Sequence, residues 1–202
     1  MSRMHWFRLI PRTALHLGRR GVGLEGTETF CGADTLFSAF CLTVRHLQGD
    51  DALTAFLERF PRQGGPDLLP PFRFTSAFPC AGDVRFLPKP LTPAHLSREA
   101  AEGYGKRLKE VRFVSLPLFT AWLNGDPLDD HLAAENFLQG GSLWVTEAER
   151  HSLEAFRNTR TGEIELWRVD GVPRVTVDRV TSRSAVYQAG AVRYRRARSG
   201  TD

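Results

Sequence analysis

Arginines crowd the two ends of this chain, and arginine is the side chain whose planar guanidinium grips phosphate oxygens through paired hydrogen bonds. Residues 1–20 carry five arginines and no acidic residue, and residues 171–202 carry seven arginines against two aspartates. The remaining residues are net acidic, because they hold most of the 23 acidic side chains. Two basic ends around an acidic middle are expected when both ends contribute to one face that meets phosphates. A G- and C-rich genome also favours arginine codons, so placement carries more weight than number.

A glycine-rich stretch at residues 18–26 follows the first basic end and contains Arg19 and Arg20. Glycine permits unusual backbone dihedrals, so these arginines can approach a phosphate backbone closely. Residues 21–26 also match G-x-G-x-x-G, but a further six residues precede any helical period, which argues against a dinucleotide-binding turn. We interpret the stretch as a loop that presents two arginines. His16, just before it, could bond RNA or act as a general base on a 2′-hydroxyl.

Residues 172–181 alternate valines with polar side chains, which predicts a strand. We expect its valines to face a core and its arginines and threonines to lie on or near an open side. Such residues suit contacts to phosphates and 2′-hydroxyls, although they are also ordinary on a solvated strand face. The candidate contacts here are Arg174, Thr176, Arg179, Thr181, Arg183 and Ser184.

Metal and cofactor sites are not indicated. Residues 124–142 contain several acidic side chains, but no second ligand group stands at a diagnostic spacing, so we interpret them as a solvated loop. Cys31, Cys41 and Cys80 are far apart and form no C-x-x-C pair, so they read as small core residues. The four tryptophans are expected in the core or at a subunit interface rather than as platforms for bases.

Hydrophobic periodicity indicates the elements that must position these side chains. Two helices are expected, one with Asp34 as N-cap that runs to Leu47, and one from about Asp51 that Pro61 ends. The predicted strands lie at residues 5–10, 72–78, 84–87 and 172–181, with 72–78 and 84–87 as a hairpin. A looser extended stretch is expected at 13–17, a short helix at 118–123 and a returning arm at 186–194. This order fits an α+β sandwich with helices on one side of an antiparallel sheet.

The composition is that of a folded single domain. The chain has 202 residues, of which 42% are hydrophobic and 25% charged. No window approaches 18 uninterrupted apolar residues, and the first residues lack the pattern of a signal peptide. We therefore expect no contact with a membrane and a cytoplasmic location.

Several short strings occur in a definite order along the chain. They are Gly32-Ala33-Asp34-Thr35-Leu36-Phe37-Ser38-Ala39, Thr75-Ser76-Ala77-Phe78-Pro79, Phe86-Leu87-Pro88-Lys89-Pro90, residues 106–115, and residues 175–181 with Ser184 and Tyr187. No single string is specific, but their order across about 160 residues is. Together they resemble one family, the RAMP-type subunit that caps the crRNA 5′ end in type III-A CRISPR effector complexes, the Csm assemblies.

The resemblance implies an α+β, ferredoxin-like and RRM-related RAMP domain over residues 1–202, with an insertion at about 50–145 and a thumb-like β-hairpin at 174–194. It implies a scaffold without catalysis that grips the repeat-derived 5′ tag of crRNA and meets target RNA only indirectly. The large polymerase subunit and a backbone RAMP subunit would be its protein partners. Ser38 and Lys89 join the candidate RNA contacts on this basis. Family members continue into a second half with a glycine-rich RNA-binding loop, which we expect to be absent from this chain.

Two other functions remain open. RAMP-fold endoribonucleases mature crRNA without a metal, and His16 is where such an activity would reside, although no second histidine or lysine completes an acid–base pair. A protein–protein adaptor without RNA contact is the third possibility.

Overall fold

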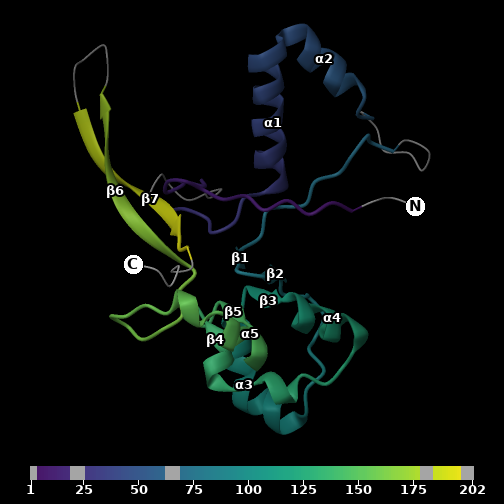
Figure 1. Ribbon diagram of the computed structural model, residues 1–202, viewed down its shortest axis with the longest axis vertical. Helices are drawn as coiled ribbons and strands as arrows, with labels where there is room; N and C mark the ends of the chain where they lie inside the picture. The colour runs from purple at the N-terminus through teal and green to yellow at the C-terminus, as the bar shows by residue number, and fades with distance from the viewer. Residues whose placement is uncertain (1–3, 19–25, 62–68, 178–183, 197–202) are drawn as a thin grey trace. The chain divides into compact units, whose positions relative to one another are not determined.

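The computed structural model describes residues 4–18, 26–61, 69–177 and 184–196 (Figure 1). These residues form two compact units. The sheet unit comprises the described parts of residues 1–29 and 78–202, and the phenylalanine unit comprises those of residues 30–77. In the described part of the chain, no helix has the length and apolar character needed to cross a membrane.

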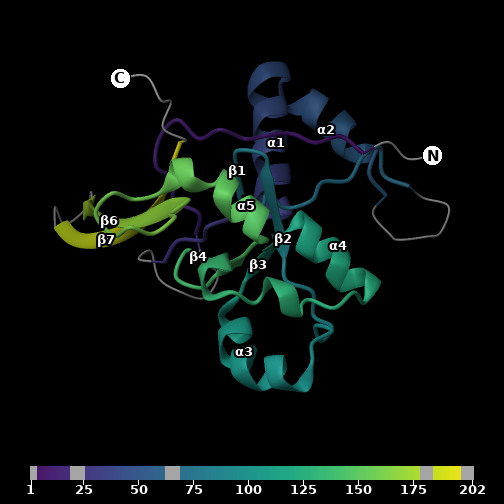
Figure 2. The same cartoon turned by 60° about the horizontal axis from the view of Figure 1, so that its bottom comes forward.

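A five-stranded mixed sheet forms the centre of the sheet unit, with strand order β1-β2-β3-β5-β4. Strands β3 and β5 are parallel, and the other neighbours are antiparallel. Figure 2 shows α3, α4 and α5 around these short strands. The strands are β1 (Cys80–Ala81), β2 (Val84–Pro88), β3 (Phe113–Ser115), β4 (Phe137–Leu138) and β5 (Leu143–Trp144); the helices are α3 (Arg98–Glu110), α4 (Leu116–Asn124) and α5 (Glu147–Ser152), and 3-10 turns lie at Asp129–His131, Ala134–Asn136 and Glu154–Phe156.

Local capping fixes the ends of these helices. The Ser97 hydroxyl accepts a hydrogen bond from the backbone N–H of Ala100 at the start of α3. A capping box between Thr146 and Glu149 begins α5. Helix α4 ends at Gly125, whose φ of 77° is a left-handed conformation that glycine adopts without strain.

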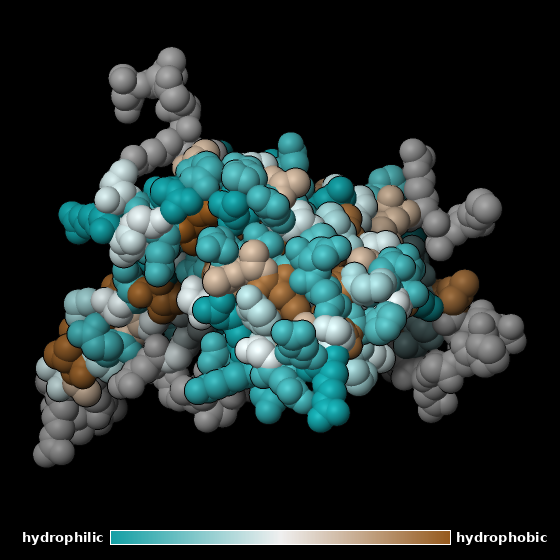
Figure 3. All heavy atoms as spheres, turned by 90° about the horizontal axis from the view of Figure 1, so that it is seen from below, coloured by the Kyte–Doolittle hydropathy of each residue, from teal (hydrophilic) through white to brown (hydrophobic). Residues whose placement is uncertain are grey.

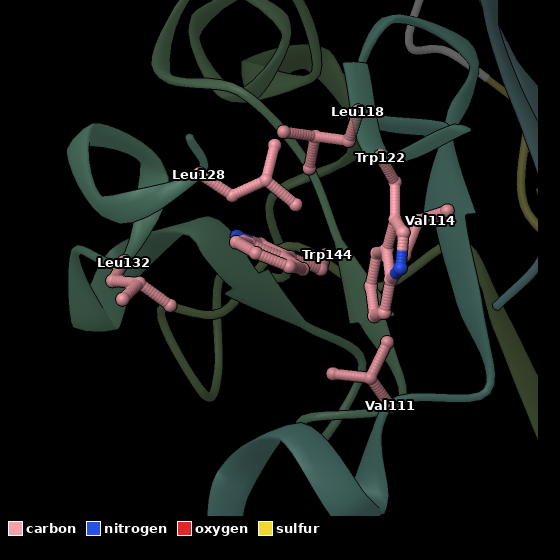
Figure 4. Packing of buried hydrophobic residues seen from close by; sticks show 7 residues of the cluster. All are labelled: Val111, Val114, Leu118, Trp122, Leu128, Leu132 and Trp144. Atoms are coloured by element: carbon pink, nitrogen blue, oxygen red, sulfur yellow. The ribbon is translucent and has the colours of Figure 1, made fainter. Parts of the chain in front are cut away.

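Two tryptophans organise the hydrophobic core of the sheet unit. Trp122 from α4 and Trp144 from β5 meet edge to face, with ring centroids 6.1 Å apart (Figure 4). Their indole N–H groups donate to the backbone carbonyls of Thr92 and His131, so neither polar atom is buried without a partner. Figure 3 shows a largely hydrophilic outer face with scattered hydrophobic groups. The buried cluster consists of Val111, Val114, Leu118, Trp122, Leu128, Leu132 and Trp144.

A long antiparallel hairpin, β6 (Trp167–Val177) and β7 (Ser184–Tyr194), also belongs to the sheet unit (Figure 1). Its eleven residue pairs run without a bulge from Trp167 opposite Tyr194 to Val177 opposite Ser184. The base is fixed by Gln139, whose side-chain oxygen accepts from the backbone N–H of Leu166 while its amide donates to the Trp167 carbonyl. The half of the hairpin farther from this base is exposed.

Helices α1 (Ala33–Gln48) and α2 (Asp50–Glu58) form the phenylalanine unit with the extended segment that contains Phe72 and Phe74. The rings of Phe37, Phe40, Phe56, Phe60, Phe72 and Phe74 contact one another at centroid distances of 4.9–6.3 Å. These aromatic pairs, rather than fully buried aliphatic side chains, join its three segments.

Phe56→Ala should loosen the phenylalanine unit more than any solvent-facing change in α2, because the Phe56 ring contacts four other phenylalanine rings. We expect a loss of roughly 2–3 kcal/mol. Hydrogen exchange of amides 33–58 measures it, and these amides should exchange faster while those of β2 and β3 keep their rates. Glu58→Ala on the same helix is the control, and equal exchange in both variants would contradict the packing role.

The fold confirms the α+β class, both predicted helices, the strand at residues 84–87 and the late hairpin. A ferredoxin-like arrangement is not confirmed, and the sheet is mixed rather than wholly antiparallel. The single domain with an insertion at about 50–145 stays a prediction.

Three predicted strand features were wrong. Residues 5–10 are not a strand, and there Arg8 instead donates to the Gly82 carbonyl. Residues 72–78 form only an isolated bridge between Cys31 and Ala77, because β1 is the true hairpin partner of β2. Val175 and Val177 do not face a core as predicted, since they are 60% and 57% exposed, and Val186 on the paired strand is 71% exposed.

Candidate nucleic-acid interface

The segment before the glycine-rich stretch pairs with the late hairpin, although about 175 positions separate them in the sequence. Leu15 and Val192 exchange two backbone hydrogen bonds of 2.8 and 2.7 Å in an antiparallel bridge. Because the pairing is antiparallel, the chain from Leu15 to Gly18 runs along β7 toward the hairpin tip.

The glycine-rich stretch has a closed stem beside β7. Gly18 bridges Thr27, whose hydroxyl accepts from the backbone N–H of Leu17 at 2.9 Å. The N–H of Glu28 donates to the Leu17 carbonyl at 2.7 Å. Arg19 and Arg20 lie outside the described residues, but the stem fixes where their segment begins and ends.

The strand of the stem that follows the glycine-rich stretch, residues 27–29, is held by contacts on both sides. The carboxylate of Glu28 lies 3.0 Å from the guanidinium of Arg112, and the Tyr194 hydroxyl donates to the Thr29 carbonyl at 2.7 Å. The anchors tie the stem to the region beside β3 and to β7. The described residues of the stem are therefore held in place by side-chain bonds on both sides.

His16 lies within the stem and is exposed. Its Nδ1 is 2.6 Å from the Gly190 carbonyl of β7, a bond that requires the proton on Nδ1 in the neutral ring. Nε2 is then an acceptor that faces away from this contact. That atom suits a bond from a ribose 2′-hydroxyl.

The hairpin register assigns its candidate residues to two faces. Arg174 lies opposite Tyr187 and Thr176 opposite Ala185, so these four share one face. Ser184 lies opposite Val177, on the opposite face of the hairpin from Arg174 and Thr176. An RNA strand that runs along the face of Arg174 and Thr176 would therefore not contact Ser184 directly. Arg179, Thr181 and Arg183 lie outside the described residues.

Neither Lys89 nor Ser38 is a residue of the stem or of the hairpin. The Lys89 ammonium donates to the Leu108 carbonyl at 2.7 Å, near the negative end of the α3 dipole. Its charge thus already has a partner within the chain. Ser38 is exposed on α1, in the phenylalanine unit.

One carboxylate of the acidic stretch at residues 124–142, that of Asp129, is hydrogen-bonded to Ser97. Asp129 accepts from the hydroxyl and the backbone N–H of Ser97 at 2.5 and 3.0 Å. These bonds lower the pKa of the Asp129 carboxyl below its usual value. Among the described residues, no group of three potential metal ligands occurs.

Asp129→Asn should shift the stability of the sheet unit in a pH-dependent way. A lowered carboxyl pKa stabilises the fold above its ordinary value near 3.8, and this contribution disappears as the pH falls through the folded-state value. The variant should therefore have a lower urea midpoint than the unmodified chain at pH 7, and the two midpoints should converge as the pH falls below 3.8 and through the folded-state pKa of Asp129. Asp130→Asn is the matched control, and a constant difference across these pH values would refute the assignment.

A second group of arginines, which the sequence patterns did not indicate as a group, lies at the base of the hairpin. A pocket of about 330 Å³ there is lined by Arg157, Arg168, Arg193, Arg195 and Arg196 with Ala155, Phe156 and Tyr194. The run Arg193-Tyr194-Arg195-Arg196 was a signal for part of it. Arg157 comes from a turn far from this run, and no spacing rule could have joined the two.

The comparisons with known proteins give a sequence relative and a structural one. No family model matches the chain. The chain is 30% identical over 171 residues to the CRISPR system Cms protein Csm4 of Thermococcus onnurineus (strain NA1), covering 81% of this chain and 46% of that protein. The chain thus spans about half the length of this curated relative.

A solved structure of a Csm3–Csm4 subcomplex in the type III-A CRISPR-Cas interference complex is similar at a TM-score of 0.49 and 14% identity. That match covers 83% of this chain and 50% of the other. The sequence relative confirms the resemblance that the ordered strings indicated, because a Csm4 protein matches most of the chain.

Proposed function

We propose that this chain is a subunit of a type III-A CRISPR RNA-guided effector complex that binds and caps the repeat-derived 5′ tag of crRNA without catalysing a reaction. The 30% identity to a Csm4 protein over 81% of the chain carries this proposal. The paired stem and hairpin supply the geometry, since Leu15 and Val192 join the two basic ends of the chain.

The tag would lie along the hairpin face of Arg174 and Thr176, beside the stem that begins the glycine-rich stretch. Arg174 offers a paired grip on a phosphate, and Thr176 offers a hydroxyl to a backbone oxygen or a 2′-hydroxyl. The Nε2 acceptor of His16 and the arginines at positions 19, 20, 179 and 183 extend this set. Lys89, Ser38, Thr181 and Ser184 stay candidates on the resemblance.

The protein partners in this proposal are a backbone RAMP subunit and the large polymerase subunit, and target RNA is met only through the assembled complex. Co-expression with each subunit, followed by purification through a tag on the partner, tests these contacts.

Binding of a labelled repeat-tag RNA tests the function directly. On single strands the logarithm of affinity falls with the logarithm of salt at about −0.7 per neutralised phosphate, so a grip on several phosphates gives a steep slope. Arg179→Ala with Arg183→Ala should weaken RNA retention in the assembled complex without changing any cleavage product. An adaptor without RNA contact would show no RNA binding and no crosslinks.

The rival endoribonuclease would use His16 as a base, and the Gly190 contact does orient that ring. Incubating repeat RNA with the protein and a chelator separates the two functions. We expect intact RNA, and cleavage that His16→Ala abolishes would favour the nuclease.

A further inference from the structure

We propose that the arginine pocket at the base of the hairpin binds a phosphate of the same RNA strand, at a second site toward the base from Arg174 and Thr176. The five arginines that line it are Arg157, Arg168, Arg193, Arg195 and Arg196. This inference rests on the proposed function, because it assumes that the ligand is RNA.

Positive charge exceeds negative charge in the pocket. Three carboxylates pair with its arginines: Glu154 with Arg157, Glu165 with Arg195, and Asp170 with both Arg168 and Arg193. Within the described residues, Arg196 has no acidic partner, and Asp170 lies 4.0 Å from Arg193. Five guanidinium groups against three carboxylates leave a site for an anion.

The register supplies a second, independent observation. Arg168 and Arg193 lie directly opposite each other on neighbouring strands. Like charges in this position destabilise a sheet unless something lies between them. Asp170 offsets part of this repulsion, since it is 3.0 Å from Arg168. A phosphate that accepts from both guanidinium groups would remove the rest.

Two of the pocket arginines are fixed for binding before a ligand arrives. Glu154 holds the Arg157 guanidinium through two contacts of 2.6 and 2.7 Å, and the Gly162 carbonyl accepts from the same group. Glu165 holds Arg195 at 2.6 Å and accepts from the Asn158 amide at 2.8 Å. Held guanidinium groups lose little side-chain entropy when they bind.

An elongated polyanion fits this surface better than a compact anion. Arg168 and Arg193 share their hairpin face with Arg174, because all three occupy the same alternation of the register. Arg174 is six positions after Arg168 in β6, so the two positions lie about 20 Å apart along the strand. A single RNA strand carries phosphates over such a length, and it can occupy the pocket and the outer face together.

The test changes the charge of the pocket in both directions. Arg193→Gln with Arg196→Gln removes two exposed cations, while Asp170→Asn removes the carboxylate that competes with the phosphate. The probe is a fluorescein-labelled single-stranded repeat-tag RNA, titrated at several salt concentrations. Arg98→Gln with Arg160→Gln is the matched control, since it removes the same charge outside the pocket.

The double pocket variant should lose roughly tenfold or more in affinity, and its salt slope should become shallower by about 0.7 to 1.4 than that of the control. Asp170→Asn should bind at least as tightly as the unmodified chain. Thermal unfolding midpoints of all variants serve as the folding check, and Arg193 and Arg196 are suitable because neither is buried.

The outcomes separate the pocket from the proposed function. If the unmodified chain binds RNA and the pocket variants match the control, the pocket inference is wrong while the function stands. If the unmodified chain binds no RNA, both the function and this ligand are wrong. Titration with inorganic phosphate, followed through arginine Nε–Hε resonances, reports on the pocket by itself, and unmoved resonances there would count against a phosphate site.

Discussion

Replacement of Trp144 by alanine should cost about 4 kcal/mol of folding stability, the largest effect of any single truncation in the sheet unit. Trp144 is fully buried in β5, stacks on Phe137 at 5.5 Å and meets Trp122 at 6.1 Å. Its indole N–H also donates to the His131 carbonyl, which the variant leaves without that partner. Urea or thermal unfolding measures the loss, and a melting temperature lower by on the order of 10 °C is expected.

Trp6→Ala provides the control for this prediction. The Trp6 side chain is 60% exposed and is contacted by the Arg85 guanidinium at 4.9 Å from its ring. An exposed cation–π contact is worth roughly 0.5–1 kcal/mol, so this variant should unfold close to the unmodified chain. Equal losses in the two variants would show that ring contacts in general, rather than the buried pair, limit stability.

The sequence predicted best those elements in which the periodicity of residue types agrees with the secondary structure that forms. Residues 172–181 alternate in type, and a long strand covers most of that stretch. The faces were nevertheless wrong, because alternation shows that a strand has two sides but not which side another layer covers. Val175 and Val177 lie on the exposed half of a two-stranded hairpin, where nothing in the local pattern indicates their exposure.

Helix α3 shows the opposite failure, since it formed where no helix was predicted. Its sequence contains Gly103 and Gly105, which lower helix propensity, and few apolar residues. The helix is held by the Ser97 cap and by Tyr104 and Leu108, which pack against the tryptophan core. Tertiary contacts of this kind are not visible in a short sequence window.

The sequence predicts which segments hold the candidate residues but not how the fold brings those segments together. The arginine-rich ends indicated a phosphate-binding face, and the Leu15–Val192 bridge does join segments from those ends. The pocket at the hairpin base was missed because Arg157 reaches it from a 3-10 turn, a contact that depends on the path of the chain between residues 157 and 193.

Leu15→Pro should separate RNA binding from folding, and it is the sharpest test of the joined ends. Proline lacks the N–H that Leu15 donates to the Val192 carbonyl at 2.8 Å, so the stem should detach from β7. The hairpin keeps its own ladder, because β6 pairs with the other edge of β7. If the stem and hairpin grip one RNA strand, affinity for repeat-tag RNA should fall roughly 10- to 100-fold, the loss of one or two charge-assisted contacts.

Leu15→Ala is the matched variant, since it truncates the same side chain but keeps the N–H. Its RNA affinity should stay within about threefold of the unmodified chain if backbone pairing, and not the leucine side chain, positions the stem. Hydrogen exchange at Val192, whose N–H donates to the Leu15 carbonyl at 2.7 Å, reports whether the bridge has opened. An opened bridge with unchanged RNA affinity would show that the two basic ends act independently, and the hairpin face alone would then have to account for tag binding.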